Sequence, residues 1–234
     1  MTDPALRSES QALRVTAIIP ALNEENAIGA VISAIPGHLV GDVVVVDGGS
    51  ADHTVQRATD AGARVVVEPL LGYGRACLTG ARESPGCEIL LFMDGDGSDA
   101  PEQAERLVLP IADGKADLVL GSRTRGCLEP GALGVHQLLG NRLVATILNH
   151  RYGLTLTDIG PFRAIRRDVF DAVCLQEQTY GLPTEMIRNV ARGGYRIREL
   201  PVDYRHRVGG TSKVSGNPRG SLLAGWQMLR VATR

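Results

Sequence analysis

Short apolar runs and helical patterns alternate through the first half of this chain, and no other feature limits its fold as strongly. The runs are followed by short links and fall at residues 15–19, 43–46, 64–68, 89–93 and 118–120. Between them, apolar residues recur at helical spacing at residues 27–35, 54–61, 72–82 and 101–112. Strands and helices that alternate in this way predict one α/β domain with a mostly parallel, doubly wound sheet and helices on both faces.

The first four predicted strands end at residues suited to binding or turning. In chain order, these are Pro20, Asp47, Glu68 and Asp94. Because the carboxyl ends of parallel strands meet at one edge of a sheet, an acidic crevice is expected there, where open α/β sheets place their ligands. Asp94 and Asp96 lie two positions apart, a spacing that can bind one divalent cation and through it a phosphorylated ligand.

Several kinds of site compete for residues 94–99. The stretch fits the metal-binding Asp-x-Asp of a nucleotide-sugar enzyme, the nucleophile loop of a haloacid-dehalogenase-type phosphatase, a calcium loop or a solvated acidic loop. The calcium loop needs glycine where Asp99 stands. The phosphatase would use Asp94 as a covalent nucleophile and needs a later lysine and paired acids. The only lysines are Lys115 and Lys213, and no acidic pair follows a later apolar strand.

Composition narrows the classes of function. The formal net charge of −1 provides no bulk positive charge for nucleic acid. The four cysteines lack C-x-x-C spacing, which argues against a zinc site and fits a reducing, cytoplasmic setting. Residues 1–13 are polar, so we expect a flexible tail and no secretory signal. No apolar run reaches the length of about 18 residues that spans a bilayer.

Positive charge gathers near the C-terminus. After Arg188 the chain carries nine further Arg and Lys residues against only Glu199 and Asp203. This excess favours an anionic ligand or a membrane surface as a partner. Residues 218–234 contain an apolar stretch with Trp226 and flanking arginines, which predicts an amphipathic helix. The helix would rest on the membrane or pack on the core, and the sequence leaves both possibilities open.

Eight stretches resemble, in order, the motifs of family 2 glycosyltransferases of GT-A fold, and most of all the dolichyl- and polyprenyl-phosphate mannose or glucose synthases. They are IPALNE at 19–24, VDGGSADHT at 46–54, GYG at 72–74, MDGDGS at 93–98, GSR at 121–123, GNR at 140–142, DIGPFRA at 158–164 and HRVGGTSK at 206–213. The resemblance implies a GT-A domain at residues 14–217. Residues 14–120 would form its nucleotide-sugar half and residues 121–217 its acceptor half.

The resemblance also implies roles for single residues. Asp47 would receive hydrogen bonds from the base, within a nucleotide-sugar site formed by Pro20, Asn23, Glu24, Asp47, Gly74, Asp94 and Gly95. Asp94 and Asp96 would hold Mg²⁺ or Mn²⁺ against the donor diphosphate. The catalytic set would comprise the acids and the phosphate-binding cations Asp96, Glu185, Arg123, Arg207 and Lys213. Departures from the family pattern at Gly48, Ser98 and Pro161 leave the base and the donor sugar open.

The implied reaction moves a sugar from a nucleoside-diphosphate sugar to a polyprenyl (dolichyl-type) phosphate. A phosphate monoester has a second pKa of about 6 and is largely anionic at neutral pH. It therefore needs positioning cations rather than a general base, and the chain offers cations in or beside loops at Arg123, Arg125, Arg163, Arg207 and Lys213. Direct displacement with inversion follows. The alternative acceptor is a soluble small-molecule or saccharide hydroxyl, which would need a base such as His136 or His206.

Two expectations concern the end of the domain. Residues 208–218 hold three glycines and Lys213, and they are expected to close over the donor and acceptor phosphates and exclude water. The protein is expected in the cytoplasm, peripherally attached to the inner face of the cell membrane through the C-terminal helix. Its oligomeric state stays open.

Overall fold

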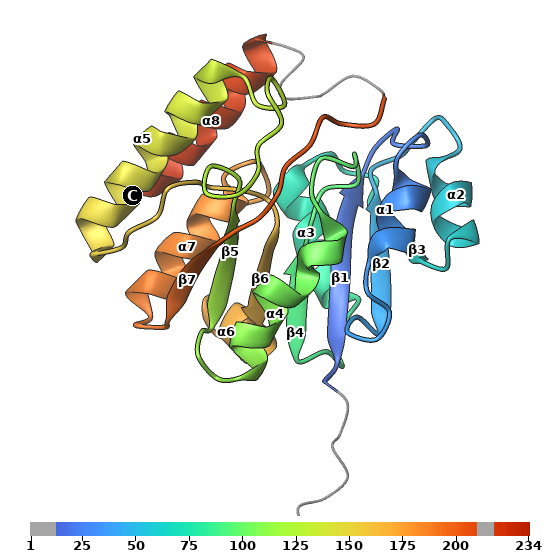
Figure 1. The fold of residues 1–234 in the computed structure, drawn as a ribbon, viewed down its shortest axis with the longest axis horizontal. Helices are drawn as coiled ribbons and strands as arrows, with labels where there is room; N and C mark the ends of the chain where they lie inside the picture. The colour runs from blue at the N-terminus through green and yellow to red at the C-terminus, as the bar shows by residue number, and fades with distance from the viewer. Residues whose placement is uncertain (1–12, 210–217) are drawn as a thin grey trace, which may run out of the picture.

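One sheet of seven strands organises the structure, in the order β3-β2-β1-β4-β6-β5-β7 (Figure 1). The computed structural model describes residues 13–209 and 218–234. The strands are β1 Val15–Ala21, β2 Asp42–Asp47, β3 Arg64–Val67, β4 Ile89–Phe92, β5 Leu118–Ser122, β6 Arg163–Arg166 and β7 Ile197–Pro201. The pairings are parallel except those of β6, which runs antiparallel to β4 and β5. The predicted mostly parallel α/β domain is confirmed.

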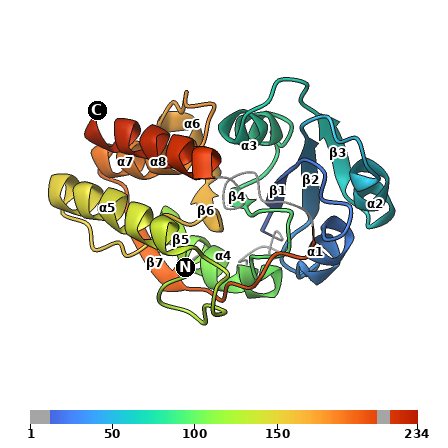
Figure 2. The same ribbon diagram turned by 90° about the horizontal axis from the view of Figure 1, so that it is seen from above.

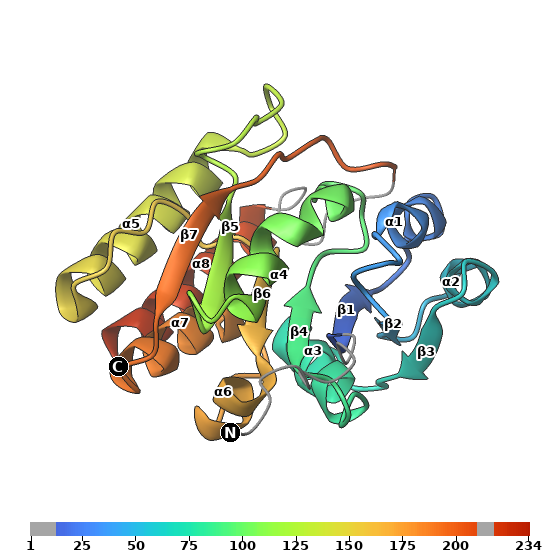
Figure 3. The same cartoon turned by 60° about the horizontal axis from the view of Figure 1, so that its bottom comes forward.

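Helices cover both faces of this sheet, as the view from above shows (Figure 2). One group comprises α1 Ile28–Ala34, α2 Thr54–Asp60 and α4 Ala104–Ala112, which follows a 3₁₀ turn at Pro101–Gln103. The other comprises α3 Tyr73–Arg82, α5 Val135–Tyr152, α6 Arg167–Ala172, α7 Leu182–Arg192 and α8 Pro218–Thr233. Figure 3 shows α4 in front of the sheet and α7 and α8 behind it.

The alternating side chains of β4 join the two cores. Leu90 and Phe92 face the core under the second group of helices, whereas Ile89 and Leu91 face the core under the first. All four are buried. A strand buried on both faces needs apolar residues at every position, which explains the continuous run before Asp94.

The reversed direction of β6 brings a further segment to the acidic edge of the sheet. Arg163, the first residue of β6, pairs with Phe92 at the end of β4 and with Leu120 near the end of β5. Residues 158–162, which precede β6, therefore lie where the parallel strands end. The antiparallel direction of β6 was not expected from the alternation of strands and helices.

Local structure differs from the sequence interpretation at two places. Asparagine is a favoured N-cap residue, but Asn23 does not cap α1, which starts at Ile28 with Ala27 as its N-cap. Asn23 instead has a φ of +54° and accepts a hydrogen bond from the backbone N–H of Ala51, so it ties the loop after β1 to the loop after β2. Helix α6 was not expected, because its few residues give little periodicity.

The C-terminal helix α8 packs against α5 and α7 along one side (Figures 1 and 2). Val231 and Ala232 are buried, and the carbonyl oxygen of Ala232 accepts a hydrogen bond from Arg151 on α5. The opposite side stays in solvent, with Trp226 56% exposed. Packing on the core is therefore confirmed for the inner side of the helix, and the membrane role stays a prediction. Within the described ranges, none of the helices has the length and apolar character to cross a membrane.

Candidate active site

A cavity of about 630 Å³ lies at the edge of the sheet where β1, β2, β4 and β5 end. Its walls come from the loops after these strands, from the segment after β7, and from α5 and α8. The residues predicted from the sequence that line this cavity are Pro20, Glu24, Asp94, Gly95, Asp96, Arg123 and Arg207. The fold thus brings together acids and cations that lie far apart in the chain.

Three acids meet in the loop after β4. Burial raises the pKa of Asp94 well above its usual value, and the nearby carboxylates of Asp99 and Asp96 raise it further. Asp99 Oδ2 accepts a hydrogen bond of 2.9 Å from the backbone N–H of Asp94, and burial raises the pKa of Asp99 as well. Because carboxylates repel one another in a buried site, a positive charge placed among them would stabilise their ionised forms.

Arg207 supplies positive charge from the segment after β7. Its Nη2 lies 2.9 Å and 2.8 Å from the two carboxylate oxygens of Glu24. Its Nη1 lies 3.6 Å from Asp96 Oδ2. The guanidinium therefore links the loop after β1 to the loop after β4, beside the position where a donor diphosphate would meet Asp94.

Backbone contacts hold the Arg207 segment against the acidic loop. The N–H of Val208 donates to the carbonyl oxygen of Asp96, and the N–H of Arg205 donates to that of Ser98, both at 2.9 Å. Gly97 has a φ of +80°, and a Cβ at this position would lie 2.9 Å from Val208 Cγ2. Glycine is therefore required at residue 97 both by the backbone conformation and by the close approach of the two segments.

Arg123 is held by a buried carboxylate. Its Nε and Nη2 donate to Asp158 at 2.7 Å and 2.8 Å, and the ring of Tyr204 lies 5.1 Å from its Cζ. Burial would raise the pKa of Asp158, but the charge and hydrogen bonds of Arg123 lower it overall. Burial likewise opposes ionisation of Arg123. The charge of Asp158 and its hydrogen bonds nevertheless raise the pKa of Arg123. The pair therefore remains charged inside the protein.

The acids fit a hard divalent cation, because carboxylate oxygens are the ligands that Mg²⁺ and Mn²⁺ favour. Asp94 and Asp96 are the candidate ligands, and Glu24 lines the same cavity. Over residues 13–209 and 218–234, no group of three or more His, Cys, Asp or Glu is arranged to hold an ion by itself. An ion here would take further ligands from the donor diphosphate and from water.

Some predicted site residues lie outside the lining of the cavity. Asp47 is buried, and its oxygens accept hydrogen bonds from the N–H groups of Gly49 and Ser50 and from the Ser50 hydroxyl. Its contact with a base stays a prediction. Asn23 accepts the hydrogen bond from the N–H of Ala51 described above, which ties two loops together. Lys213 falls outside the described residues, together with most of the segment expected to close over the site.

Gly74 and Glu185 support the wall of the cavity from behind. A Cβ at Gly74 would overlap the carbonyl oxygen of Glu177, so glycine lets α3 approach residues 176–181. Glu185 Oε2 accepts hydrogen bonds from the N–H groups of Gln176 and Glu177 at 2.9 Å and 2.7 Å. These contacts hold the wall of the cavity in place, and a catalytic role for Glu185 stays a prediction.

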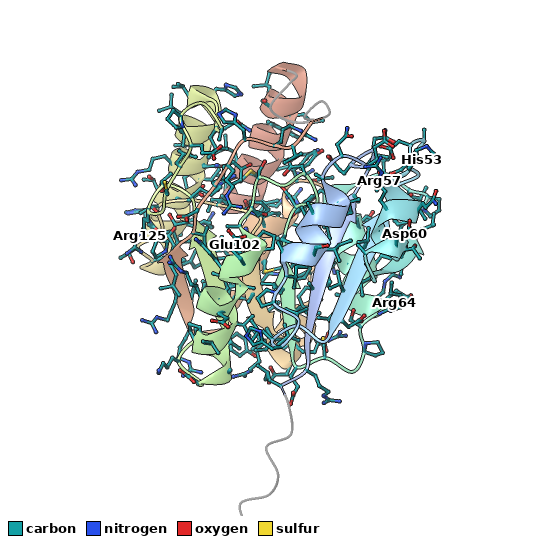
Figure 4. All side chains as sticks on the ribbon, turned by 45° about the vertical axis from the view of Figure 1, so that its right-hand side comes forward. His53, Arg57, Asp60, Arg64, Glu102 and Arg125 are labelled. Carbon is teal, nitrogen blue, oxygen red and sulfur yellow. The ribbon has the colours of Figure 1, made fainter. Side chains whose placement is uncertain are left out.

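The other candidate cations and bases, apart from His136, do not line the cavity. Arg125 lies on the outer flank of the molecule, far from Arg57 and Asp60 on α2, and pairs with Glu199 (Figure 4). Arg163 is fully buried and donates to backbone carbonyl oxygens. His206 Nε2 donates to the carbonyl oxygen of Pro130 at 2.9 Å, outside the lining of the cavity, whereas His136 lines it.

Sequence reasoning missed several lining residues. Tyr73 and Tyr180 stack with ring centroids 5.9 Å apart and line the wall beside Asp94. Glu68 and Gly48 line the part near β2 and β3. Glu68 was not missed, because it is one of the strand ends at which the acidic crevice is expected, whereas Tyr180 follows no pattern. The contribution of α5 and α8 to the cavity has no local signal either, because it depends on how the helices pack.

The comparisons with known proteins agree with this geometry. The family described as "Glycosyl transferase family 2" matches residues 16–174. An uncharacterized glycosyltransferase of Mycobacterium tuberculosis is 38% identical over 216 residues, covering 90% of this chain and 94% of that protein. An undecaprenyl-phosphate mannosyltransferase of Micrococcus luteus is 34% identical over 247 residues, covering 93% of this chain and 98% of that protein.

Among solved structures, glucosyl-3-phosphoglycerate synthase from Mycobacterium tuberculosis has a similar fold. Its complex with phosphoglyceric acid has a TM-score of 0.75 at 25% identity, covering 94% of this chain and 79% of that one. The same synthase has also been crystallised with Mn²⁺, uridine-diphosphate-glucose and phosphoglyceric acid. Fold, site and sequence agree, and this chain belongs to glycosyl transferase family 2.

Proposed function

We propose that this protein moves a sugar from a nucleoside-diphosphate sugar to a polyprenyl phosphate, with Mg²⁺ or Mn²⁺ as cofactor and with inversion at the sugar carbon. The observation that carries the proposal is a single cavity lined by the acids Asp94 and Asp96 and by the cations Arg123 and Arg207. Membership of the family supports sugar transfer and removes the phosphatase interpretation, in which Asp94 would form a covalent phosphoenzyme.

The chemistry follows from the charge that develops on the leaving group. A divalent cation on Asp94 and Asp96 would act as a Lewis acid on the nucleoside diphosphate. Arg207 adds a donor of charge-assisted hydrogen bonds, and it can exchange part of its pairing with Glu24 for phosphate oxygens. An oxygen of the acceptor phosphate forms the new bond to the sugar carbon while the diphosphate oxygen departs with the electron pair. No proton has to be removed from this acceptor.

The acceptor class rests on cations rather than on a base. Arg123 lines the cavity, and Asp158 fixes the orientation of its guanidinium. The relative named as an undecaprenyl-phosphate mannosyltransferase supports a polyprenyl phosphate. The synthase complexed with phosphoglyceric acid supports a second candidate, a soluble phosphorylated small molecule. Both acceptors carry phosphate, so the cations at Arg123 and Arg207 suit either. The apolar residues that line the cavity favour the lipid.

An exposed apolar face supports action at a membrane surface. Six of the twelve exposed large hydrophobic residues in the described part of the chain lie on α5 and α8, between 50% and 76% exposed. We call this set the apolar face; it consists of Val135, Leu139, Leu143, Leu222, Leu223 and Trp226. Apolar patches of this kind mark interaction sites, and helices that carry them can lie in the interface of a bilayer. Peripheral attachment at the inner face of the cell membrane remains part of the proposal.

A donor panel tests this function. The purified chain is incubated with UDP-, GDP- and dTDP-sugars, Mg²⁺ or Mn²⁺, and either undecaprenyl phosphate or 3-phosphoglycerate, and release of nucleoside diphosphate is followed. We expect release to depend on undecaprenyl phosphate with at least one donor. Release that is as fast without any acceptor, or that depends only on 3-phosphoglycerate, would contradict the proposed acceptor.

A further inference from the structure

The cavity continues beyond the acids and cations into an arm between α5 and α8. Its walls include the apolar residues Val144, Ala224 and Met228 and the glycines Gly140 and Gly225. The polar residues of the two helices that line it are His136, Gln137, Asn141, Ser221 and Gln227. Ile159 and Pro161, which precede β6, line the same cavity. The apolar part of these walls offers no side-chain hydrogen bonds to the charges and hydroxyl groups of a nucleoside-diphosphate sugar. This part of the arm suits an apolar occupant.

Contacts at both ends hold the two helices side by side around this arm (Figures 1 and 2). Near their start, His136 Nε2 lies 3.2 Å from the Ser221 hydroxyl. Near their end, Arg151 donates to the carbonyl oxygen of Ala232 at 3.0 Å. The arm is thus bounded by a fixed pair of helices.

Two glycines leave the arm open. A Cβ at Gly140 or at Gly225 would meet no atom within 4 Å, and neither residue has a positive φ. Some other glycines of the chain are explained by crowding: a Cβ at Gly126 would overlap the backbone of Val202. Glycine weakens a helix relative to alanine, so its presence at two uncrowded helical positions needs another reason. The space that the missing side chains leave is that reason.

The arm leads outward to the apolar face. Gly140 and Gly225 are half-exposed, and the exposed side chains of Leu139, Leu143 and Trp226 lie on the same two helices within one turn of them. At its inner end the cavity holds Arg123 and Arg207. Cations at one end and an apolar opening at the other complement a phosphate carried on a hydrocarbon chain. A phosphorylated small molecule would leave the arm unfilled.

We propose that the arm between α5 and α8 binds the first isoprene units of the acceptor lipid, and that Gly140 and Gly225 set its width. This inference rests on the proposed function and adds to it the residues that select an acceptor by its chain. A long chain would pass through the arm and leave the protein across the apolar face.

The experiment fills the arm without disturbing the fold. Gly140→Leu and Gly225→Leu each place a side chain in open space and favour the helix, so both variants should keep the unfolding temperature of the unaltered protein. Thr146→Leu is the matched control, because it adds the same side chain at an exposed position of α5 outside the cavity lining. Each protein is assayed with dimethylallyl, geranyl and undecaprenyl phosphate, and the affinity for the donor nucleotide is measured separately.

We expect kcat/KM of the unaltered protein to rise from dimethylallyl to geranyl phosphate. The two leucine variants should lose about ten- to a hundredfold in kcat/KM with geranyl and undecaprenyl phosphate, the range that corresponds to burying one branched aliphatic group. They should keep their nucleotide affinity, and Thr146→Leu should behave like the unaltered protein with every acceptor.

The outcomes separate this inference from the proposed function. If no prenyl phosphate of any length is used by the unaltered protein, the proposed function fails and the inference falls with it. If prenyl phosphates are used but the leucine variants match the unaltered protein at every chain length, only the inference is wrong. A loss of nucleotide affinity equal to the loss of transfer would assign the arm to the donor instead.

Discussion

Arg123 and Asp158 form the most deeply buried ion pair next to the cavity, with side chains 7% and 0% exposed. Asp158 also accepts hydrogen bonds from the backbone N–H groups of Arg123 and Ile159. Such a pair contributes little to stability in itself, because taking both charges out of water costs about as much as their attraction returns. Its effect is to fix the orientation of a guanidinium that lines the cavity.

Removal of one partner should be costly. Asp158→Asn leaves the Arg123 charge buried without its counter-ion, and we expect the free energy of unfolding to fall by about 3–5 kcal/mol. Asp113→Asn is the control, because the Asp113–Lys115 pair is more than half exposed and such pairs contribute at most about 1 kcal/mol. Urea unfolding at neutral pH measures both. Equal losses of unfolding free energy in the two variants would mean that the buried pair affects stability no more than an exposed pair does.

The difference in unfolding free energy between the unaltered protein and Asp158→Asn depends on pH with a definite sign. The folded protein lowers the pKa of Asp158, so the pair stabilises the fold fully above the usual Asp value of about 4. Its contribution is lost as the pH falls through the lowered pKa, where the unaltered protein also protonates Asp158. The gap between the unaltered protein and Asp158→Asn should therefore be constant from neutral pH down to about 4 and narrow below it. A gap that widens on acidification would contradict the assigned pair.

Asp96 offers the sharpest test of the metal assignment. Asp96→Asn should lower turnover by about 10² or more, as the loss of a main charge stabiliser does. EDTA should abolish the activity of the unaltered protein, and Mg²⁺ or Mn²⁺ should restore it. Asp60→Asn, on the outer side of α2, should have normal activity. Full activity in EDTA, or no effect of Asp96→Asn, would defeat the assignment.

The sequence could predict those site residues that sit at the ends of strands. Asp94, Asp96 and Pro20 follow apolar runs, so the sheet itself brings them together. Asp47 also follows a strand, but its carboxylate is taken up by its own turn, and periodicity does not reveal that. Tyr180 lies in a loop whose place depends on contacts from α3, α7 and α8. Such long-range contacts leave no mark on the local sequence.

Among the elements, the acidic loop and the segment after β7 act as one unit. Gly97→Ala would put a side chain on a residue with a φ of +80° and against Val208. We expect a loss of about 1–3 kcal/mol in stability and a larger proportional loss of activity, because Arg207 precedes Val208. Gly86→Ala is the control, since a Cβ there meets nothing within 4 Å and the φ is not positive. Thermal unfolding and turnover are measured together. Normal activity in Gly97→Ala would show that the close approach does not position Arg207.

The outer side of α8 allows a direct test of membrane contact. Leu222→Glu combined with Leu223→Glu places negative charges on the apolar face without changing a buried residue. The fluorescence of Trp226, the only tryptophan, should shift to the blue with anionic vesicles in the unaltered protein and much less in this variant. Leu109→Glu, at an exposed position of α4, should behave like the unaltered protein. Equal binding to vesicles by all three proteins, or by none, would remove α8 from the proposed membrane contact.

Elements with strong periodicity could be predicted from the sequence, whereas the direction of β6 could not. The strands β1 to β5 and the helices between them follow from alternation and from turn residues. The antiparallel direction of β6 depends on where α5 returns the chain, which is a property of the packed molecule. The C-terminal helix was expected to be amphipathic, and it divides as expected, with Val231 and Ala232 inside and Trp226 outside.

At the scale of the whole molecule, the two halves contribute different chemistry to one cavity. The strands β1 to β4 supply the acids, whereas β5, the segment after β7, and the helices α5 and α8 supply cations and apolar walls. The expected nucleotide-sugar half at residues 14–120 and acceptor half at residues 121–217 stay a proposal, and α8 lies outside both. A donor that needs a metal and an acceptor that needs apolar contact can meet only where both halves face the cavity.

The identity of the product tests the proposed function most directly. The purified chain is incubated with the nucleoside-diphosphate sugar that gives turnover, a divalent cation, and either undecaprenyl phosphate or undecaprenol, and the extracted lipids are analysed by mass spectrometry. We expect a sugar joined to the lipid through its phosphate, in the anomeric form opposite to that of the donor, and no product from undecaprenol. A sugar on undecaprenol, or a soluble phosphorylated acceptor that is glycosylated while undecaprenyl phosphate is not, would contradict this account.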